Sequence, residues 1–164
     1  MSSFSHIDAQ GNAVMVDVSG KAVTSRTAVA TGRIRMSAAC YEAVRQRAVK
    51  KGDVLGVAQI GGIMGAKRTS DLIPLCHILN LTHCGVEFIF HDETTEIEAQ
   101  CTVRCDGKTG VEMEALTGVS VALLTIYDMC KAVDKRMCIQ DIHVVEKTGG
   151  KGGHFQYETD MNQS

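Results

Sequence analysis

Two acidic side chains and one basic side chain lie on a long apolar stretch of this sequence, Thr109 to Asp134, where they could transfer protons. Glu114 and Asp128 are fourteen residues apart, nearly four helical turns, so they would project from one side of a helix. Lys131 follows Asp128 by three residues and would lie beside it. A carboxylate and an amine that shift each other's pKa suit general acid–base chemistry. The same pattern also fits a plain surface pair and acids at the positive end of a helix dipole.

This stretch must form a helix to place those groups. Its β-branched residues favour a strand, but a strand of this length would exceed the usual limit of about ten residues. We therefore predict one long helix against which the rest of the chain packs. Its apolar or small side chains recur at spacings of three and four, on one face: Val111, Ala115, Val119, Ala122, Ile126, Met129 and Val133.

Composition indicates one domain that binds neither nucleic acid nor membrane. The 164 residues are 45% hydrophobic, enough for a single core. A net charge of −2 and only 4% aromatic residues disfavour a nucleic-acid partner. The uncharged run from Ala115 to Tyr127 is shorter than the roughly 18 residues of a membrane span, and we find no apolar signal core. Seven cysteines, an odd count, fit a reducing compartment, so we expect a cytoplasmic protein.

Periodicity predicts the other elements. Two helices are expected before a hairpin, the first from the cap Ser37 to Gly52 and the second from the cap Asp53 to Thr69. Strands are expected at 28–36, 81–91, 96–105 and 138–147. If the arm ahead of the first strand and the extra helix are left out, the order is strand, helix, strand, strand, helix, strand. This is the order of the ferredoxin-like α+β fold, an antiparallel sheet with helices packed on one face.

Two surfaces of this fold are predicted to be polar. The sheet's other face is left to solvent or to another subunit, and it carries Glu96, Glu98 and Arg104. An exposed, charged arm is expected ahead of the first strand, with Asp17, Lys21 and Arg26.

The second helix is interrupted by four glycines, at Gly56, Gly61, Gly62 and Gly65. Each costs about 1 kcal/mol relative to alanine in a helix interior. Either this helix packs closely against another backbone, or a ligand approaches it. The spacing of a phosphate-binding loop is absent. Lys51 and Lys67 bracket the helix, and with Arg26 they could offset the charge of an anionic ligand.

A turn at the only proline precedes the hairpin. Cys76 and His77 follow it, and with His83 and Cys84 they form a CHxxxxxHC pattern of thiols and imidazoles that suggests a metal. The spacing fits no zinc motif, and a strand from Leu81 would point His83 and Cys84 to opposite faces. We therefore predict no metal site.

Four segments resemble, in order, the motifs of the molybdenum cofactor biosynthesis protein C family: MVDVSGK, GDVLGVAQIGGIMGAKRTSDLIPLCH, TGVEMEALTGVSVALLTIYDMCKAVD and EKTGGKGG. The likeness covers nearly the whole chain, and the long-helix and LIPLCH motifs are highly specific. It implies a lyase that converts a 3′,8-cyclised dihydro-GTP into cyclic pyranopterin monophosphate and releases pyrophosphate. We expect a mobile segment over residues 1–14, one catalytic domain over 15–153 and a polar tail over 154–164.

The resemblance also implies residue roles. The family's catalytic residues fall on Asp128, Lys51 and Lys131. Its substrate-binding residues fall on Leu75, Cys76, His77, Glu112, Met113 and Glu114, to which the charge argument adds Lys67 and Arg26. The sequence departs from the family pattern at Gln59, Ile78 and Gly152, which removes no catalytic residue. The chemistry requires no cofactor, and Mg²⁺ on the substrate phosphates is compatible with it.

Distance predicts a shared site. Glu114 and Asp128 would lie about 21 Å apart along a helix that rises about 1.5 Å per residue, too far to contact one small substrate. If both serve one site, two subunits must share it at a dimer interface. The family's homohexamer, a trimer of dimers, fits this requirement. The other open interpretation is a nucleotide-binding regulatory module, which would bind its ligand without changing it.

Overall fold

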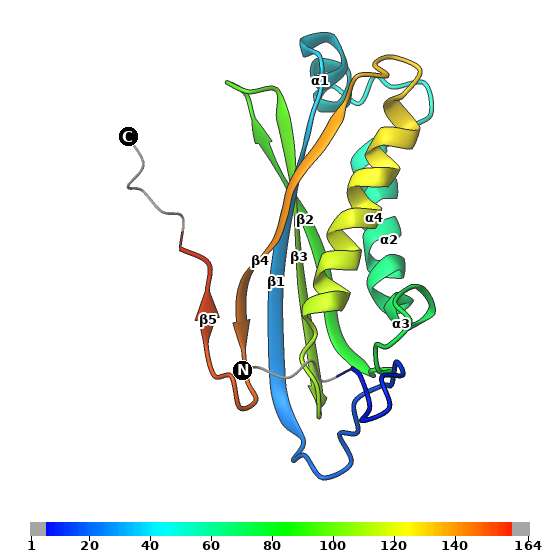
Figure 1. Cartoon of the computed structure of the whole chain (residues 1–164). Helices are drawn as coiled ribbons and strands as arrows, with labels where there is room; N and C mark the ends of the chain where they lie inside the picture. The colour runs from blue at the N-terminus through cyan, green and yellow to red at the C-terminus, as the bar shows by residue number, and fades with distance from the viewer. Residues whose placement is uncertain (1–5, 159–164) are drawn as a thin grey trace, which may run out of the picture.

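The computed structural model describes residues 6–158, and in that range a five-stranded sheet carries helices on one of its faces (Figure 1). Residues 1–5 and 159–164 lie outside the described residues, and with them part of the predicted N-terminal segment and part of the predicted tail. The strands are β1 (Thr24–Arg35), β2 (Leu81–His91), β3 (Glu96–Gly107), β4 (Cys138–Thr148) and β5 (Phe155–Gln156). The helices are α1 (Ala38–Arg45), α2 (Val54–Lys67), α3 (Thr69–Leu72) and α4 (Glu112–Cys130).

The sheet has the predicted topology. Its strand order is β2-β3-β1-β4-β5, and every neighbouring pair is antiparallel. The helices α2 and α4 follow β1 and β3 and cover the same face, which confirms the ferredoxin-like α+β fold (Figure 1). Strand β2 forms one edge of the sheet. The sequence did not indicate β5, because a strand of two residues carries no alternation.

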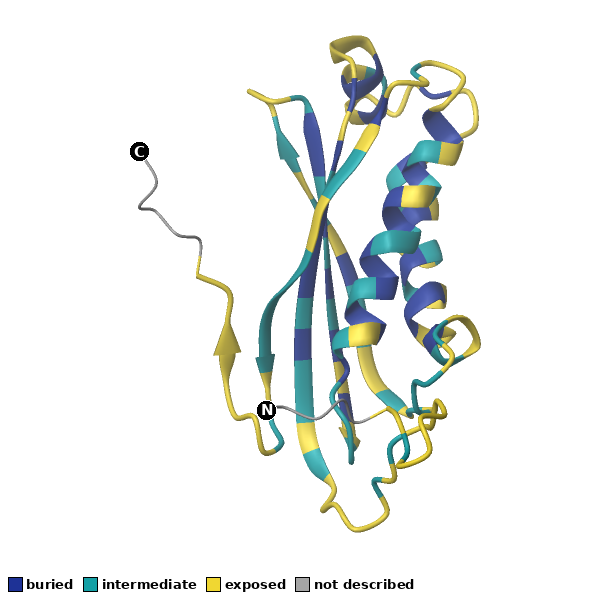
Figure 2. Ribbon diagram, viewed as in Figure 1, coloured by how far each residue is buried: buried dark blue, intermediate teal, exposed yellow. Residues whose placement is uncertain are grey.

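Helix α4 is the central helix of the core. Six of the seven residues in its predicted apolar stripe are buried, and Figure 2 shows dark blue along the side of α4 that faces the sheet. The seventh, Val133, is 53% exposed because α4 has ended at Cys130. By length and composition α4 could cross a membrane, but more than half of its most apolar window is buried inside the fold. Burial against the sheet therefore accounts for its apolar character.

The glycines of α2 permit close contact with α4. A Cβ atom on Gly62 would lie 2.9 Å from the backbone oxygen of Gly118 and 3.1 Å from the Cβ of Ala122. One on Gly65 would lie 2.7 Å from a methyl group of Val121. Such distances leave no room for a side chain at either position. The interpretation that this helix packs against another backbone is confirmed.

The helix caps are confirmed, but α1 is shorter than predicted. Ser37 Oγ accepts a hydrogen bond of 3.2 Å from the Cys40 amide, and Asp53 Oδ1 accepts one of 3.1 Å from the Gly56 amide. Helix α1 ends at Arg45, not near Gly52. The backbone turns sharply where Arg47 adopts a φ of +54°, and the turn lets Val49 enter the core.

The predicted charged arm was wrong for Arg26. Strand β1 begins at Thr24, and Arg26 pairs with Cys105 of β3. Its side chain is half-buried, and its Nε donates a hydrogen bond of 3.0 Å to the carbonyl oxygen of Gly107. The local sequence there lacks apolar alternation, so the strand is defined by pairing across the sheet.

The open face of the sheet carries a bonded network in place of a row of solvated charges. Arg33 lies 3.2 Å from Glu96 and 3.4 Å from Glu98, and Gln140 donates to Glu96 over 2.6 Å. Glu96 is only 6% exposed, so its predicted exposure was wrong. Burial raises the pKa of Glu98, but hydrogen bonds from Thr31 and the His91 ring, together with the charge of Arg33, outweigh it and lower that pKa overall.

Candidate active site

Two lysines and an aspartate meet at the C-terminal end of α4. Lys131 Nζ donates a hydrogen bond of 2.7 Å to Asp128 Oδ1. Lys51, from the loop between α1 and α2, donates one of 2.9 Å to the Asp128 backbone oxygen and lies 3.8 Å from its Oδ2. Asp128 is in the last turn of α4, and its side chain is 61% exposed. The structure thus brings together the three residues to which the sequence assigned catalysis.

The charges in this cluster support one another. A hydrogen bond and the positive charge of Lys131, followed by the charge of Lys51, hold the pKa of Asp128 below its ordinary value. The Asp128 carboxylate in turn raises the pKa of Lys131. The Asp128 carboxylate and the Lys131 ammonium therefore stabilise each other in their charged forms. The cluster borders a cavity of about 580 Å³ lined by Lys51, Tyr127, Lys131, Ala132 and Lys135.

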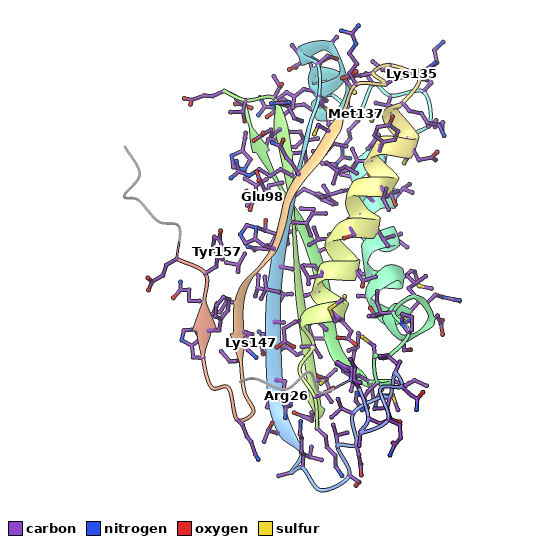
Figure 3. All side chains as sticks on the ribbon, viewed as in Figure 1. Arg26, Glu98, Lys135, Met137, Lys147 and Tyr157 are labelled. Carbon is purple, nitrogen blue, oxygen red and sulfur yellow. The ribbon has the colours of Figure 1, made fainter. Side chains whose placement is uncertain are left out.

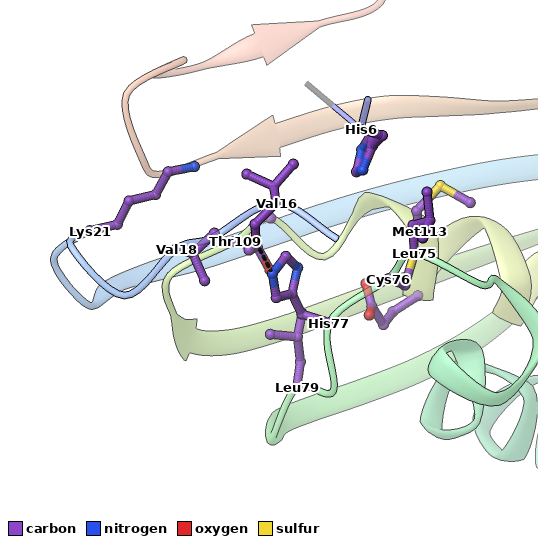
Figure 4. Close-up of a pocket in the computed structure, with 12 residues that line it drawn as sticks. His6, Val16, Val18, Lys21, Leu75, Cys76, His77, Leu79, Thr109 and Met113 are labelled. Atoms are coloured by element: carbon purple, nitrogen blue, oxygen red, sulfur yellow. Dashed lines mark hydrogen bonds between the residues drawn. The ribbon is translucent and has the colours of Figure 1, made fainter. Parts of the chain in front are cut away.

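A second group of predicted residues lines a cavity near the N-terminal end of α4 (Figure 4). Leu75, Cys76 and His77 reach it from the turn before β2, and Met113 and Glu114 from the first turn of α4. The His77 ring makes a hydrogen bond of 2.7 Å to the Val16 carbonyl oxygen, which fixes its orientation (Figure 4). The cavity measures about 320 Å³, and His6, Val18, Lys21, Leu79, Thr109 and Gly110 complete its wall with Val16.

Glu114 is the buried acid of this cavity. It is 5% exposed, and burial raises its pKa. The negative charge of the nearby Glu112 carboxylate raises this pKa further. A carboxyl of this kind holds a proton at a pH at which a solvated glutamate has lost it. It can therefore donate a hydrogen bond or a proton to a ligand.

Replacing Glu114 with glutamine is expected to stabilise the protein above neutral pH. Because the folded state keeps this proton when the unfolded chain has lost it, stability is complete below the ordinary glutamate pKa and falls as pH rises through the raised pKa. The Glu114→Gln protein should melt higher than wild type at about pH 8, by about 2–4 °C for each kcal/mol relieved, and the gap should shrink towards about pH 4. Thermal melts across pH measure this. A wild type that melts higher than the variant at about pH 8 would contradict it.

Glu112 is the matched control for that experiment. Its Oε1 lies 2.9 Å from Lys147 Nζ, and the pair is only partly buried. Glu112→Gln removes both this attraction and the repulsion that Glu112 exerts on Glu114, so any gain in melting temperature at high pH should be smaller than that of Glu114→Gln.

Cationic side chains from three segments surround a neighbouring cavity of about 430 Å³. Arg26 lines it from β1, Lys21 from the preceding loop and Lys151 from the glycine-rich loop after β4. A Cβ on Gly150 would clash with the guanidinium of Arg26, so this loop packs directly on that side chain. Arg26 and Lys147 lie at the same end of the sheet in Figure 3. This end can hold a polyanionic group.

Lys67 lies apart from these groups. It lines a cavity of about 330 Å³ at the start of β2, together with Asn80, Thr82, His83 and Cys84. Among the residues that the structure describes, only Leu79 borders both this cavity and the one with His77. The structure therefore does not place Lys67 with the other predicted substrate-binding residues.

Within one chain the two groups stay separate. Glu114 begins α4 and Asp128 lies near its end, so they are about 21 Å apart along the helix axis. They also differ in environment, because Glu114 is buried against the sheet and Asp128 stands clear of it. The spacing predicted that both side chains would project from the polar side of the helix, but Glu114 is buried and Asp128 is exposed.

Sequence reasoning missed the part that the N-terminal segment plays. His6, Val16 and Val18 line the cavity with His77, although this segment has no periodic pattern. The MVDVSGK motif was the signal available, and it includes two of these residues. In residues 6–158, no three side chains of the metal-binding types gather closely enough to hold a metal. His77 and His83 instead line separate cavities.

The fold and these two groups define a ferredoxin-like α+β protein with an aspartate–lysine cluster at one end of α4 and a cavity with a buried glutamate at the other. The model of the MoaC family matches residues 15–150, and the chain belongs to this family. It is 56% identical over 152 residues to the cyclic pyranopterin monophosphate synthase of Clostridium botulinum (strain Alaska E43 / Type E3), covering 93% of this chain and 96% of that protein.

Two further relatives carry the same name. The chain is 56% identical over 154 residues to the protein of Chloroflexus aggregans, which covers 94% of this chain and 93% of that one. It is 57% identical over 155 residues to the protein of Desulforapulum autotrophicum, with 94% and 95% covered. The likeness therefore extends over both groups of site residues.

Proposed function

We propose that this chain is a cyclic pyranopterin monophosphate synthase of molybdenum cofactor biosynthesis, a lyase that converts 3′,8-cyclised dihydro-GTP into cyclic pyranopterin monophosphate and pyrophosphate. Its family and the names of its relatives support this assignment. The observation that carries it furthest is the cluster of Lys51, Asp128 and Lys131. That cluster supplies a base and two acids, as a rearrangement of purine into pterin requires.

The two groups divide the chemistry. Asp128 accepts a proton from the substrate, and the adjacent ammonium groups of Lys51 and Lys131 return protons as bonds close. At the other end, Glu114 and His77 contact the ring system, and Leu75, Cys76 and Met113 enclose it. Release of pyrophosphate from a triphosphate builds up negative charge, which Arg26 and its neighbouring lysines offset. No cofactor is needed for these steps, and Mg²⁺ could accompany the phosphates.

A complete site takes its two groups from different subunits. One chain alone holds them about 21 Å apart, whereas a two-fold axis across the middle of α4 would set Glu114 of one copy near Asp128 of another. A homohexamer built as a trimer of dimers satisfies this geometry and presents six such sites. We place this assembly in the cytoplasm, where its seven cysteines stay reduced.

Incubation of the purified protein with the cyclised dihydro-GTP tests the activity. We expect stoichiometric pyrophosphate and cyclic pyranopterin monophosphate in a single turnover, identified by chromatography and mass. Recovery of unchanged substrate bound to the protein would overturn the proposal and favour a regulatory, ligand-binding role.

A further inference from the structure

Two pairs of cysteines lie in the core, and only one of them reaches a cavity. Cys84 pairs with Val103 across the β2–β3 hairpin, and Cys101 pairs with Val86, so the two thiols are diagonal neighbours on one face of the sheet. Cys101 is fully buried beneath α4, where a Cβ on Gly118 would lie 2.6 Å from its sulfur. Cys84 is partly exposed and lines the cavity of about 330 Å³ that contains Lys67. The other pair, Cys40 and Cys130, is fully buried.

The surroundings of Cys84 favour its thiolate. The neighbouring Cys101 thiol lowers the pKa of Cys84, burial opposes that effect, and the Lys67 ammonium adds to the lowering. The proximity of Cys84 and burial raise the pKa of Cys101, so that thiol stays protonated. A thiolate that is stabilised by a neighbouring cation and open to a cavity is the usual environment of a reactive cysteine.

We propose that Cys84 is a covalent modification site for small, negatively charged disulfides, which Lys67 attracts into the cavity. The Cys84 thiolate attacks one sulfur of the disulfide, a new bond joins that sulfur to Cys84, and the other half leaves as a thiolate. No further oxidant is required, because the disulfide itself is reduced. The proposal does not depend on the enzymatic activity.

Cys101 does not displace the adduct. Diagonal residues on neighbouring strands lie about 7–8 Å apart, whereas disulfides join Cα atoms at about 4.4–6.8 Å, so an internal bond would require the strands to move. The mixed disulfide therefore persists until an external thiol removes it. Modified protein should carry one added half-disulfide, with no internal Cys84–Cys101 bond.

Dithiobis(nitrobenzoate), which has a carboxylate on each half, and the cationic disulfide cystamine are suitable probes. Cys138, which is exposed at the start of β4, is the reference thiol on the same protein. Because its surroundings favour the Cys84 thiolate and Lys67 attracts the anionic probe, Cys84 should react with that probe about three- to tenfold faster than Cys138 at low salt. Peptide mapping of briefly treated wild type and Cys84→Ser protein assigns the labelled residue.

Lys67→Gln tests the role of the cation. It should slow labelling of Cys84 by the anionic probe roughly three- to tenfold at low salt. Labelling by cystamine should be slowed much less, because the variant has less Cys84 thiolate but no longer repels the cationic probe. Cys40 and Cys130 should remain unlabelled in the folded protein. The proposal fails if Cys138 is labelled before Cys84, or if Lys67→Gln slows the reactions of both probes equally. It also fails if Cys40 or Cys130 reacts as fast as Cys84.

Discussion

Asp128→Asn is expected to reduce single-turnover conversion of the cyclised dihydro-GTP by about 10²- to 10⁴-fold, the range that a general base contributes. The amide keeps the size of the side chain and can still accept the 2.7 Å hydrogen bond from Lys131, but it cannot accept a proton. Substrate binding should change little, because the loss falls on the chemical step. Rapid-quench turnover and equilibrium binding, measured in parallel, separate the two effects.

Asp71→Asn is the matched control, since Asp71 is an exposed acid on α3 that lines neither cavity. It should convert substrate at the wild-type rate. Retention of turnover within about tenfold of wild type in Asp128→Asn would remove Asp128 from the role of base. Lys51→Ala and Lys131→Ala should then be examined for the residue that carries the proton.

A mixture of two inactive variants should regain activity if subunits share their sites. Asp128→Asn inactivates the group at the C-terminal end of α4, and His77→Ala inactivates the group at its N-terminal end. Each pure variant therefore has no intact site. Random pairing of equal amounts makes half of all dimers mixed, and each mixed dimer has one intact site of two, so roughly a quarter of wild-type activity should return. The experiment requires subunit exchange, for example by dilution from mild denaturant.

Two outcomes separate the shared site from its alternative. Wild-type protein carried through the same exchange must recover its activity. If it does so while the mixture stays inactive, each site lies within one chain. A second mixture, Asp128→Asn with Lys51→Ala, places both defects in one group and should remain inactive, which shows that recovery depends on the position of the defects.

The fold was predictable wherever apolar periodicity directs packing. The stripe of α4 and the alternation of β2 and β3 each place buried side chains on one face, and the order of elements then leaves few topologies. Prediction failed where pairing between distant segments decides the structure. Arg26 lies in a strand because β3 pairs with it, and Glu96 is buried because Arg33 and Gln140 bond to it.

The site was predictable in part. The contact between Asp128 and Lys131 was predictable from their spacing on a helix. The position of Lys51 was not predictable from local pattern, because it depends on the path of the turn after α1. Only the family resemblance placed Lys51 with the other two residues. The position of the Lys67 side chain was also not predictable from local pattern. Lys67 ends α2 near the proline turn, yet its side chain lines a different cavity from that of His77. The direction in which this side chain points is determined by how the end of α2 packs against β2.

Gln59 affects whether β2, an edge strand of the sheet, can pair with strands of other molecules. Its side-chain amide donates a hydrogen bond of 2.8 Å to the carbonyl oxygen of Val86 on β2, the edge strand of the sheet. An edge strand invites strands of other molecules to extend the sheet, and free backbone acceptors are what they pair with. Because Gln59 occupies the Val86 acceptor in the middle of β2, it interrupts the row of acceptors that an incoming strand would need. The hydrogen bond of this glutamine therefore disfavours open-ended aggregation through β2.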